Sequence, residues 1–223
     1  MTEKAYRQVI EYIRKGICNH TFTLGEKLPS EREMAEQLSV SRNSVREALR
    51  VLDIMGVVHT HQGASNFISD DFGKNLVETM SMMYALNRLD NRQICEFRHA
   101  LELRAFHLAA ERITDKEIEQ MKKYLHQIEH STSDMQMAQG DRMFHYALVQ
   151  ASQSWLMIKN IEALNEVIDI FIRDIRHVVL KNPEGGKKLQ DSHWKIVEAL
   201  EKKDLEMGSI ALNSHFAYIK EQL

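Results

Sequence analysis

Cysteine and proline are scarce in this chain, with two of each among 223 residues. Cys18 and Cys95 lie far apart and form no CxxC or Cys/His pattern, which argues against a disulfide framework and against a cysteine-based zinc finger. Pro29 and Pro183 both fall at breaks between periodic segments. We therefore expect two reduced thiols and long stretches of uninterrupted helix.

Long hydrophobic runs are also missing. No window approaches the ~20 consecutive apolar residues of a membrane span, and the first residues, MTEKAYRQVIEYIRKG, are amphipathic and charged, unlike a secretory signal. A hydrophobic content of 43% is typical of a globular protein, and 223 residues suffice for one large or two modest domains. We expect a cytoplasmic protein with no membrane partner.

Positive charge is not in excess, because the formal net charge is -3. Residues 1–68 carry nine Lys and Arg against eight Asp and Glu, whereas residues 69–223 carry twenty against twenty-four. Only the first part could suit a polyanion, and there the placement of the basic residues must matter more than their total.

Beyond residue 76 the chain shows helical periodicity throughout. Apolar residues recur at intervals of three and four, as in Ile94, Phe97, Leu101, Ala105 and Leu108. The pattern predicts helices over 76–89, 91–112, 115–130, 137–153, 155–181, 187–202 and 204–221. Such faces pack as an antiparallel bundle, so we expect an all-helical domain over 76–223.

Residues 1–68 are organised differently. Helices are predicted over 2–18, 31–38 and 42–55, and VVHTHQGASNFIS then places β-branched residues on both sides of a Gly-centred turn, which predicts a small hairpin. The polar segment SDDFGKN, residues 69–75, predicts a hinge between the two domains. The expected fold is therefore mainly α, with one β-hairpin.

A helix-turn-helix pattern follows residue 28. Ser30 and Glu33 have the spacing of a capping box for one short helix, and Ser41 can cap the next. In that second helix Arg42, Arg46 and Arg50 recur every four residues, and arginine can bond both acceptors of guanine or grip a phosphate. A solvated helix face would show the same arginine stripe, so the stripe alone leaves both interpretations open.

The stretch resembles the winged helix-turn-helix of the GntR family of bacterial transcription factors. The family pattern LPSER…VSR..VREAL..L…G runs unbroken through Leu28–Arg32, Val40–Arg42, Val45–Leu49, Leu52 and Gly56. The resemblance implies an operator contact by the residues Arg32, Arg42, Asn43, Ser44 and Arg46. It also implies that Gln62 and Gly63 of the wing reach the minor groove, although Ser65 stands where the family usually has a second glycine.

Asp141 and His145 lie one helical turn apart in the amphipathic segment GDRMFHYALVQAS. A metal site inside a bundle needs ligands from several helices, and His193 and His215 lie on later amphipathic segments. One Asp with three His is a borderline ligand set that suits Zn, Ni, Mn, Co or Fe. A histidine on an apolar helix face is more often a hydrogen-bonded core residue, so the pattern alone leaves ligation open.

Residues 76–223 resemble the FCD effector-binding domain of the FadR subfamily within the GntR regulators. The matching residues are Phe97-Arg98, Leu101-Glu102, Asp141, Phe144-His145, Ala151-Ser152, His193, Ile196, Ala199, Asp204 and His215. The resemblance implies that Asp141, His145, His193 and His215 bind a divalent metal, with Zn, Ni or Mn favoured. One departure is Gln153-Ser154, where the family often has Gly-Asn, at the expected end of a helix.

Arg98 is predicted to meet a small carboxylate effector. It lies on an otherwise apolar helix, where an unpaired guanidinium would be costly, and the resemblance implies that it reaches the ligand. An internal ion pair with Glu102, one turn away, is the alternative.

Together these features predict a DNA-binding transcriptional regulator and not an enzyme. We expect a homodimer on a palindromic operator, because one recognition helix covers too few base pairs and two-fold symmetric proteins read palindromes. A small carboxylate bound at the metal would change the affinity for double-stranded DNA. The alternatives are a metal-ion-responsive regulator without an organic effector and, in another class, a metalloenzyme.

Overall fold

A computed structural model describes residues 2–61, 65–70, 73–87, 89–179 and 183–223. The chain divides into two compact units, Met1–Thr79 and Met80–Leu223. Among the described residues, no helix is long and apolar enough to cross a membrane.

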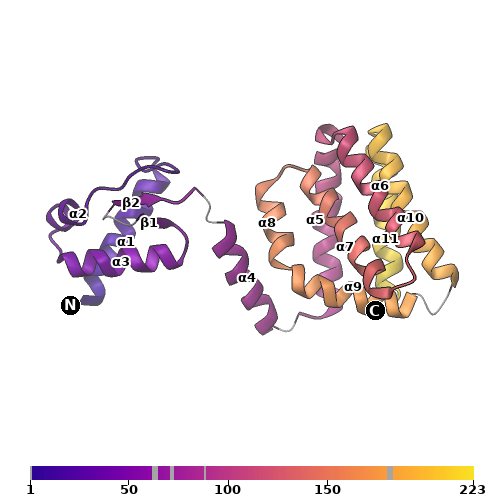
Figure 1. Ribbon diagram of the computed structural model, residues 1–223, viewed down its shortest axis with the longest axis horizontal. Helices are drawn as coiled ribbons and strands as arrows, with labels where there is room; N and C mark the ends of the chain where they lie inside the picture. The colour runs from indigo at the N-terminus through magenta and orange to yellow at the C-terminus, as the bar shows by residue number, and fades with distance from the viewer. Residues whose placement is uncertain (1, 62–64, 71–72, 88, 180–182) are drawn as a thin grey trace. The chain divides into compact units, whose positions relative to one another are not determined.

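The first unit contains three helices followed by a hairpin (Figure 1). Its elements are α1 (Thr2–Cys18), α2 (Glu31–Leu38), α3 (Arg42–Ile54), β1 (Val58–His61) and β2 (Ser65–Ile68). The two strands are antiparallel, with Val58 opposite Ile68 and His61 opposite Ser65. The predicted helices and hairpin are therefore confirmed. Their shared core consists of Val9, Ile13, Phe22, Leu28, Met34, Ala35, Val45, Ala48, Leu49, Leu52, Val58 and Ile68.

Both predicted caps of the helix-turn-helix are present. The backbone N–H of Glu33 donates to Ser30 Oγ at 3.2 Å, and the backbone N–H of Ser30 donates to the Glu33 carboxylate at 2.7 Å. Ser41 Oγ accepts from the backbone N–H of Ser44 at 3.1 Å. Between the two helices Ser39 adopts the left-handed conformation, with a φ of 54°, which ends α2 and turns the chain into α3.

The second unit is an all-helical bundle (Figure 1). Its helices are α5 (Asn91–Arg112), α6 (Asp115–His130), α7 (Asp134–Ala151), α8 (Trp155–Ala163), α9 (Asn165–Val179), α10 (Pro183–Lys202) and α11 (Leu205–Lys220). α4 (Gly73–Asn87) contains the division between the units and begins three residues before the helix predicted over 76–89. The sequence does not reveal this earlier start, because Gly73, Lys74 and Asn75 carry no apolar pattern.

The single helix predicted over 155–181 is wrong, because the chain forms α8 and α9 there. Leu164 interrupts the helix with a φ of −87° and a ψ of 0°, and the two helices run in different directions in Figure 1. The backbone N–H of Leu164 still donates to Asn160 O at 3.2 Å, and that of Ile168 to Leu164 O at 2.8 Å. The apolar periodicity continues across the break because Ile161, Leu164 and Ile168 all enter the core.

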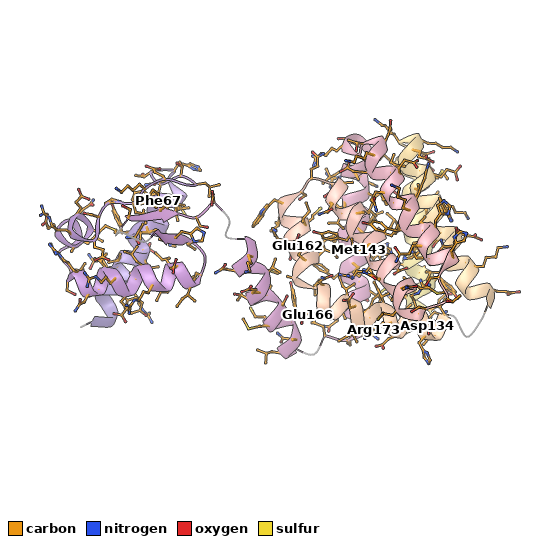
Figure 2. The ribbon with its side chains drawn as sticks, viewed as in Figure 1. Phe67, Asp134, Met143, Glu162, Glu166 and Arg173 are labelled. Carbon is orange, nitrogen blue, oxygen red and sulfur yellow. The ribbon has the colours of Figure 1, made fainter. Side chains whose placement is uncertain are left out.

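One apolar core joins the helices of the bundle. Its larger members include Ile94, Phe106, Met121, Leu125, Phe144, Leu148, Phe171, Ile196, Leu200, Leu212 and Phe216. Side chains also bridge α7 and α8, where Tyr146 donates a hydrogen bond of 2.6 Å to Glu162, the residue labelled in Figure 2. The core holds the buried polar groups described next.

Candidate functional site

The bundle gathers a buried polar cluster from five helices. α5 supplies Arg98 and Glu102, α7 supplies Asp141 and His145, and α9, α10 and α11 supply the others, Arg176, His193 and His215. No member is more than 6% exposed. Polar groups this deep are retained only when partners compensate them, so their contacts indicate what the cluster can do.

The four predicted metal ligands lie together. His145 Nε2 and His193 Nε2 are 3.2 Å apart. Asp141 places Oδ2 3.9 Å from His145 Nε2 and Oδ1 3.5 Å from His193 Nε2. Nitrogens of His145, His193 and His215 all lie within 4.8 Å of one another. Tertiary packing therefore brings these side chains from α7, α10 and α11 to one place.

The Nδ1 atoms of His145 and His215 contact neighbouring side chains. Glu102 approaches His145 Nδ1 at 2.5 Å, and Ser192 Oγ lies 2.9 Å from His215 Nδ1. Contacts of this kind fix the orientation of an imidazole ring and leave the opposite nitrogen for another partner. The side chains of Glu102 and Ser192 therefore direct the Nε2 atoms of His145 and His215 away from themselves.

The spacing of the nitrogens fits a metal ion. Two nitrogens bound to one ion at 2.0–2.1 Å stand roughly 2.8–3.4 Å apart, and the His145–His193 separation is 3.2 Å. A shared N–H···N hydrogen bond could give the same distance for one pair. It would not account for His215 Nε2, which is buried and has no hydrogen-bond partner among the described residues. Nδ1 of His193 also lacks one there.

The protonation states suit cation binding. Burial lowers the pKa of His193 to about 3, although Asp141 opposes the shift, and burial also lowers the pKa of His215. Both rings are therefore neutral at neutral pH and keep a lone pair, as a metal ligand must. Burial would raise the pKa of Asp141, but the neighbouring cationic groups outweigh it and lower the pKa. Because His193 is neutral at neutral pH, Arg176 and Arg98 are the charges that keep the carboxylate ionised there.

Arg98 makes the ion pair that was the alternative to effector binding, with Nε 2.9 Å from Glu102 Oε1. Its guanidinium also lies 5.6 Å from the ring centroids of both Phe171 and Phe216. The ion pair leaves one guanidinium nitrogen of Arg98 unused. This atom, Nη2, is buried and has no hydrogen-bond partner among the described residues. An unsatisfied buried donor costs about 1–3 kcal/mol, so this nitrogen is a candidate contact for a bound acid.

A small cavity adjoins Arg98 and His145. Its volume is about 10 Å³, and its lining also includes Arg142 and Tyr146 of α7, Ile161 of α8, and Asn165 and Ile168 of α9. This volume suits about one water molecule. An organic ligand beside Arg98 would therefore require some of these lining side chains to move.

Sequence patterns do not reveal three contacts that organise the cluster. The sequence indicates Glu102 as a motif residue and as a partner of Arg98, but not its contact with His145. Arg176 Nη1 lies 3.5 Å from Asp141 Oδ1, and Ser192 orients His215. A serine directly before His193 and a basic residue late in an amphipathic helix carry no signal by themselves, because only helix packing brings them to these partners.

The predicted DNA contacts lie on or near α3. Arg42 and Asn43 are exposed at its first turn, whereas Ser44 is only 3% exposed and its hydroxyl lies 2.9 Å from Ser41 Oγ. The structure thus places Ser44 in the helix cap and not on the surface. Arg46 and Arg32 are exposed as well, and each forms an ion pair. Arg46 lies 2.8 Å from Glu31, and Arg32 lies 3.3 Å from Glu36.

The predicted wing contacts, Gln62 and Gly63, lie outside the described residues. The strands on either side of them pair in register, so the hairpin itself is present.

Two family models match the chain. The model described as bacterial regulatory proteins, gntR family, matches residues 5–68, and the FCD domain model matches residues 93–218, which is more than half of the chain. The first match covers the helix-turn-helix and hairpin, and the second covers the buried cluster.

The chain aligns with known relatives over almost its whole length. It is 27% identical over 209 residues to the HTH-type transcriptional regulator LutR of Bacillus subtilis, covering 93% of this chain and 95% of the relative. It is also 27% identical over 216 residues to the putative L-lactate dehydrogenase operon regulatory protein of Escherichia coli, with 95% and 83% covered.

Among solved structures, Streptococcus agalactiae GntR matches with a TM-score of 0.64 and 25% identity, over 98% of this chain and 100% of that one. These relatives and this fold are those of transcription regulators, and not of enzymes. Since the cluster lies within the FCD match and α3 within the other, the chain belongs to the GntR family of DNA-binding regulators with a C-terminal FCD domain.

Proposed function

We propose that this protein is a FadR-subfamily regulator whose affinity for double-stranded DNA is controlled by a small carboxylate and a divalent metal bound in the FCD domain. The metal ligands are Asp141, His145, His193 and His215. The observation that carries the proposal is the convergence of these buried groups around Nε2 of His215, which has no hydrogen-bond partner among the described residues.

The charge balance of the cluster favours an anionic effector. Arg98 and Arg176 contribute two positive charges, and Glu102 and Asp141 contribute two negative charges. His145, His193 and His215 add no charge when they bind a metal, because a ligating imidazole is neutral. A divalent cation would therefore leave a net positive charge in a buried site. A bound carboxylate would offset that charge and would give Arg98 Nη2 a partner.

The names of relatives narrow the class of acid. One relative is named for an L-lactate dehydrogenase operon, and lactate is a 2-hydroxy acid. A 2-hydroxy acid offers a carboxylate and a neighbouring hydroxyl, and both oxygens can bind one metal ion. When bound, Zn, Ni or Mn would supply Lewis-acid attraction for these oxygens. Small 2-hydroxy acids and sugar acids are therefore the proposed effectors.

The proposed DNA interface is the start of α3 with its neighbours. Arg32, Arg42, Asn43 and Arg46 are exposed there and offer donors to bases and phosphates, whereas Ser44 positions the helix from within the cap. Gln62 and Gly63 remain the proposed minor-groove contacts. We propose a homodimer that reads a palindromic operator.

Effector and DNA binding would be coupled through helix movement. The cavity beside Arg98 holds only about 10 Å³, so an acid at that position would displace side chains that line it, among them Ile161 of α8 and Ile168 of α9. An effector changes DNA affinity only if it binds two conformations unequally, with a typical coupling of about 1–3 kcal/mol. The break at Leu164, between these two helices, is the proposed point of adjustment.

A regulator that senses the metal ion alone is the second candidate. The small cavity beside Arg98 and His145 favours it over an acid at that position, whereas a cavity of about 760 Å³ on the side of His215 and Ser192 has room for an acid. In this case metal binding by itself would change DNA affinity.

A thermal-shift screen of small 2-hydroxy acids and sugar acids tests the proposal, run on metal-loaded protein and on protein treated with a chelator. Ligands that bind the native state raise the melting temperature by mass action. We expect stabilisation by an acid only when metal is present, and reduced metal binding in His193→Ala. Stabilisation by metal alone would support the second candidate, and no effect of either would contradict both.

A further inference from the structure

We propose that the protein has a second divalent-metal site, on its surface, formed by His126, Glu129 and His130 near the C-terminal end of α6. Residues three and four apart on a helix lie on the same face. One potential ligand atom from each of these three residues lies within 4.8 Å of the others. This inference concerns a separate cluster and does not depend on the effector proposed above.

The three side chains are accessible to an ion from solvent. All three are exposed, in contrast to the buried histidines. His126 Nδ1 lies 3.1 Å from Glu129 Oε2, and the rings of His126 and His130 are 6.1 Å apart between centroids. Small rotations of exposed side chains can therefore bring the two rings and the carboxylate onto one ion.

Two residues of α10 hold Glu129 in place. Trp194 Nε1 donates to Glu129 Oε1 at 2.7 Å, and Gln190 Nε2 donates to the same oxygen at 3.4 Å. Burial would raise the pKa of Glu129, but the hydrogen bonds from Trp194, His126 and Gln190 outweigh it and lower the pKa. The carboxylate is therefore anionic and positioned before any ion arrives, and Oε2 faces His126.

The histidines keep nitrogens for an ion. His130 Nδ1 lies 2.8 Å from the backbone carbonyl oxygen of His126, and because a carbonyl only accepts, Nδ1 must carry the hydrogen. Its Nε2 therefore has a free lone pair. The ring of His126 packs against Trp194, with centroids 5.1 Å apart, which limits its orientations.

The ligand set suits Zn²⁺, Ni²⁺ and Cu²⁺. Imidazole binds these borderline ions well, and one carboxylate with two imidazoles leaves positions for water. Calcium and magnesium prefer sites made of oxygen ligands, so they should bind weakly here.

Equilibrium dialysis against Zn²⁺ tests the surface site. The double variant His126→Ala/His130→Ala should bind one Zn²⁺ fewer per chain than the wild type, and its fold should be unchanged because both residues are exposed. Glu129→Gln keeps an oxygen for Trp194 but loses the charge, and we expect roughly tenfold weaker binding at this site. His177→Ala, which removes an exposed histidine of α9 outside the cluster, is the control and should bind as the wild type does.

The count of ions separates this proposal from that of the buried site. If both are right, the wild type binds two Zn²⁺ and the double variant one. A change from one to none would support the surface site and contradict the buried one. Equal binding by the wild type and the double variant would overturn the surface site, whatever the total.

Copper provides an independent readout through tryptophan fluorescence. Trp155→Phe leaves Trp194 as the sole tryptophan of the chain, and Trp194 packs on His126. We expect Cu²⁺ bound at the surface to quench this emission. With His126→Ala/His130→Ala added, the Cu²⁺ concentration for half-quenching should rise at least tenfold, and an unchanged titration would overturn the assignment.

Discussion

Glu102 is the residue on which the order of the buried cluster most depends. One carboxylate oxygen pairs with Arg98 at 2.9 Å, and the other contacts His145 at 2.5 Å. Burial would raise its pKa, but Arg98 and His145 outweigh the burial and lower it, so the carboxylate stays ionised. The Glu102 side chain thereby neutralises Arg98, the proposed effector contact, and orients His145, a proposed metal ligand.

Glu102→Ala should lower the free energy of unfolding by about 3–5 kcal/mol, because it leaves Arg98 buried without its counterion. Urea denaturation of the two proteins measures the difference. Glu96→Ala on the same helix is the matched control, since its ion pair with Lys220 is half exposed and should contribute less than about 1 kcal/mol. Equal losses in both variants would contradict the role given to Glu102.

Gln153 shows why the family often has glycine at this position. It lies directly after the C-cap of α7 with a φ of 53°, in the left-handed region. Non-glycine residues pay about 1–2 kcal/mol for this conformation, whereas glycine adopts it without a steric penalty. The departure is confined to the helix end, as the sequence predicted.

Gln153→Gly should therefore raise the free energy of unfolding, by up to about 1 kcal/mol once the greater unfolded-state entropy of glycine is subtracted. Gln150→Gly, three residues earlier in the last turn of α7, should lower it by up to about 1 kcal/mol, because glycine loses more conformational freedom on entering a helix. Thermal or urea unfolding under one set of conditions measures the stability of both variants and of the wild type. If the free energy of unfolding changed in the same direction in both variants, the strain assigned to Gln153 would be disproved.

At the scale of the element, local signals place helix starts better than helix breaks. Asp90 and Gln93 form a capping box for α5, and Thr114 and Glu117 form another for α6. These interactions are local, so short sequence motifs specify them. The break at Leu164 has no such motif, because it requires only a small change in ψ that packing of α8 and α9 imposes.

The Asp90 cap gives a prediction for the bundle. Asp90 accepts from the backbone N–H of Gln93 at 2.8 Å, so Asp90→Ala should cost about 1 kcal/mol of stability. Ser154→Ala at the start of α8 is the control, because Ser154 makes no side-chain cap hydrogen bond and should change stability by less than about 0.5 kcal/mol. Urea denaturation distinguishes them, and a larger loss for Ser154→Ala would refute the assignment of caps.

At the scale of the whole molecule, the two units carry separate parts of the proposed function. The helix-turn-helix has its own core, and the buried cluster lies within the core of the bundle. A substitution on the surface of α3 should therefore affect DNA binding without changing the metal site.

Arg42→Ala should weaken operator binding about tenfold or more, because it removes an exposed arginine at the first turn of α3. Gel shifts at one salt concentration measure it, on a DNA site selected from random sequences by the wild-type protein. Arg173→Ala, at an exposed arginine of α9 labelled in Figure 2, should bind DNA normally. Unchanged affinity of Arg42→Ala would refute the assignment of α3.

Apolar periodicity and capping motifs act over a few residues, so the sequence alone predicts most of the helices, the hairpin and the helix-turn-helix caps, but not the break at Leu164. Helical spacing and amphipathic segments indicated the candidate ligands, such as Asp141 and His215, and family resemblance implied that they bind a metal. Only the tertiary structure decided that these groups meet, that Glu102 and Ser192 orient two histidines, and that Ser44 is buried. The physical reason is that the rotation of one helix against another depends on packing of the whole core, which no short segment encodes.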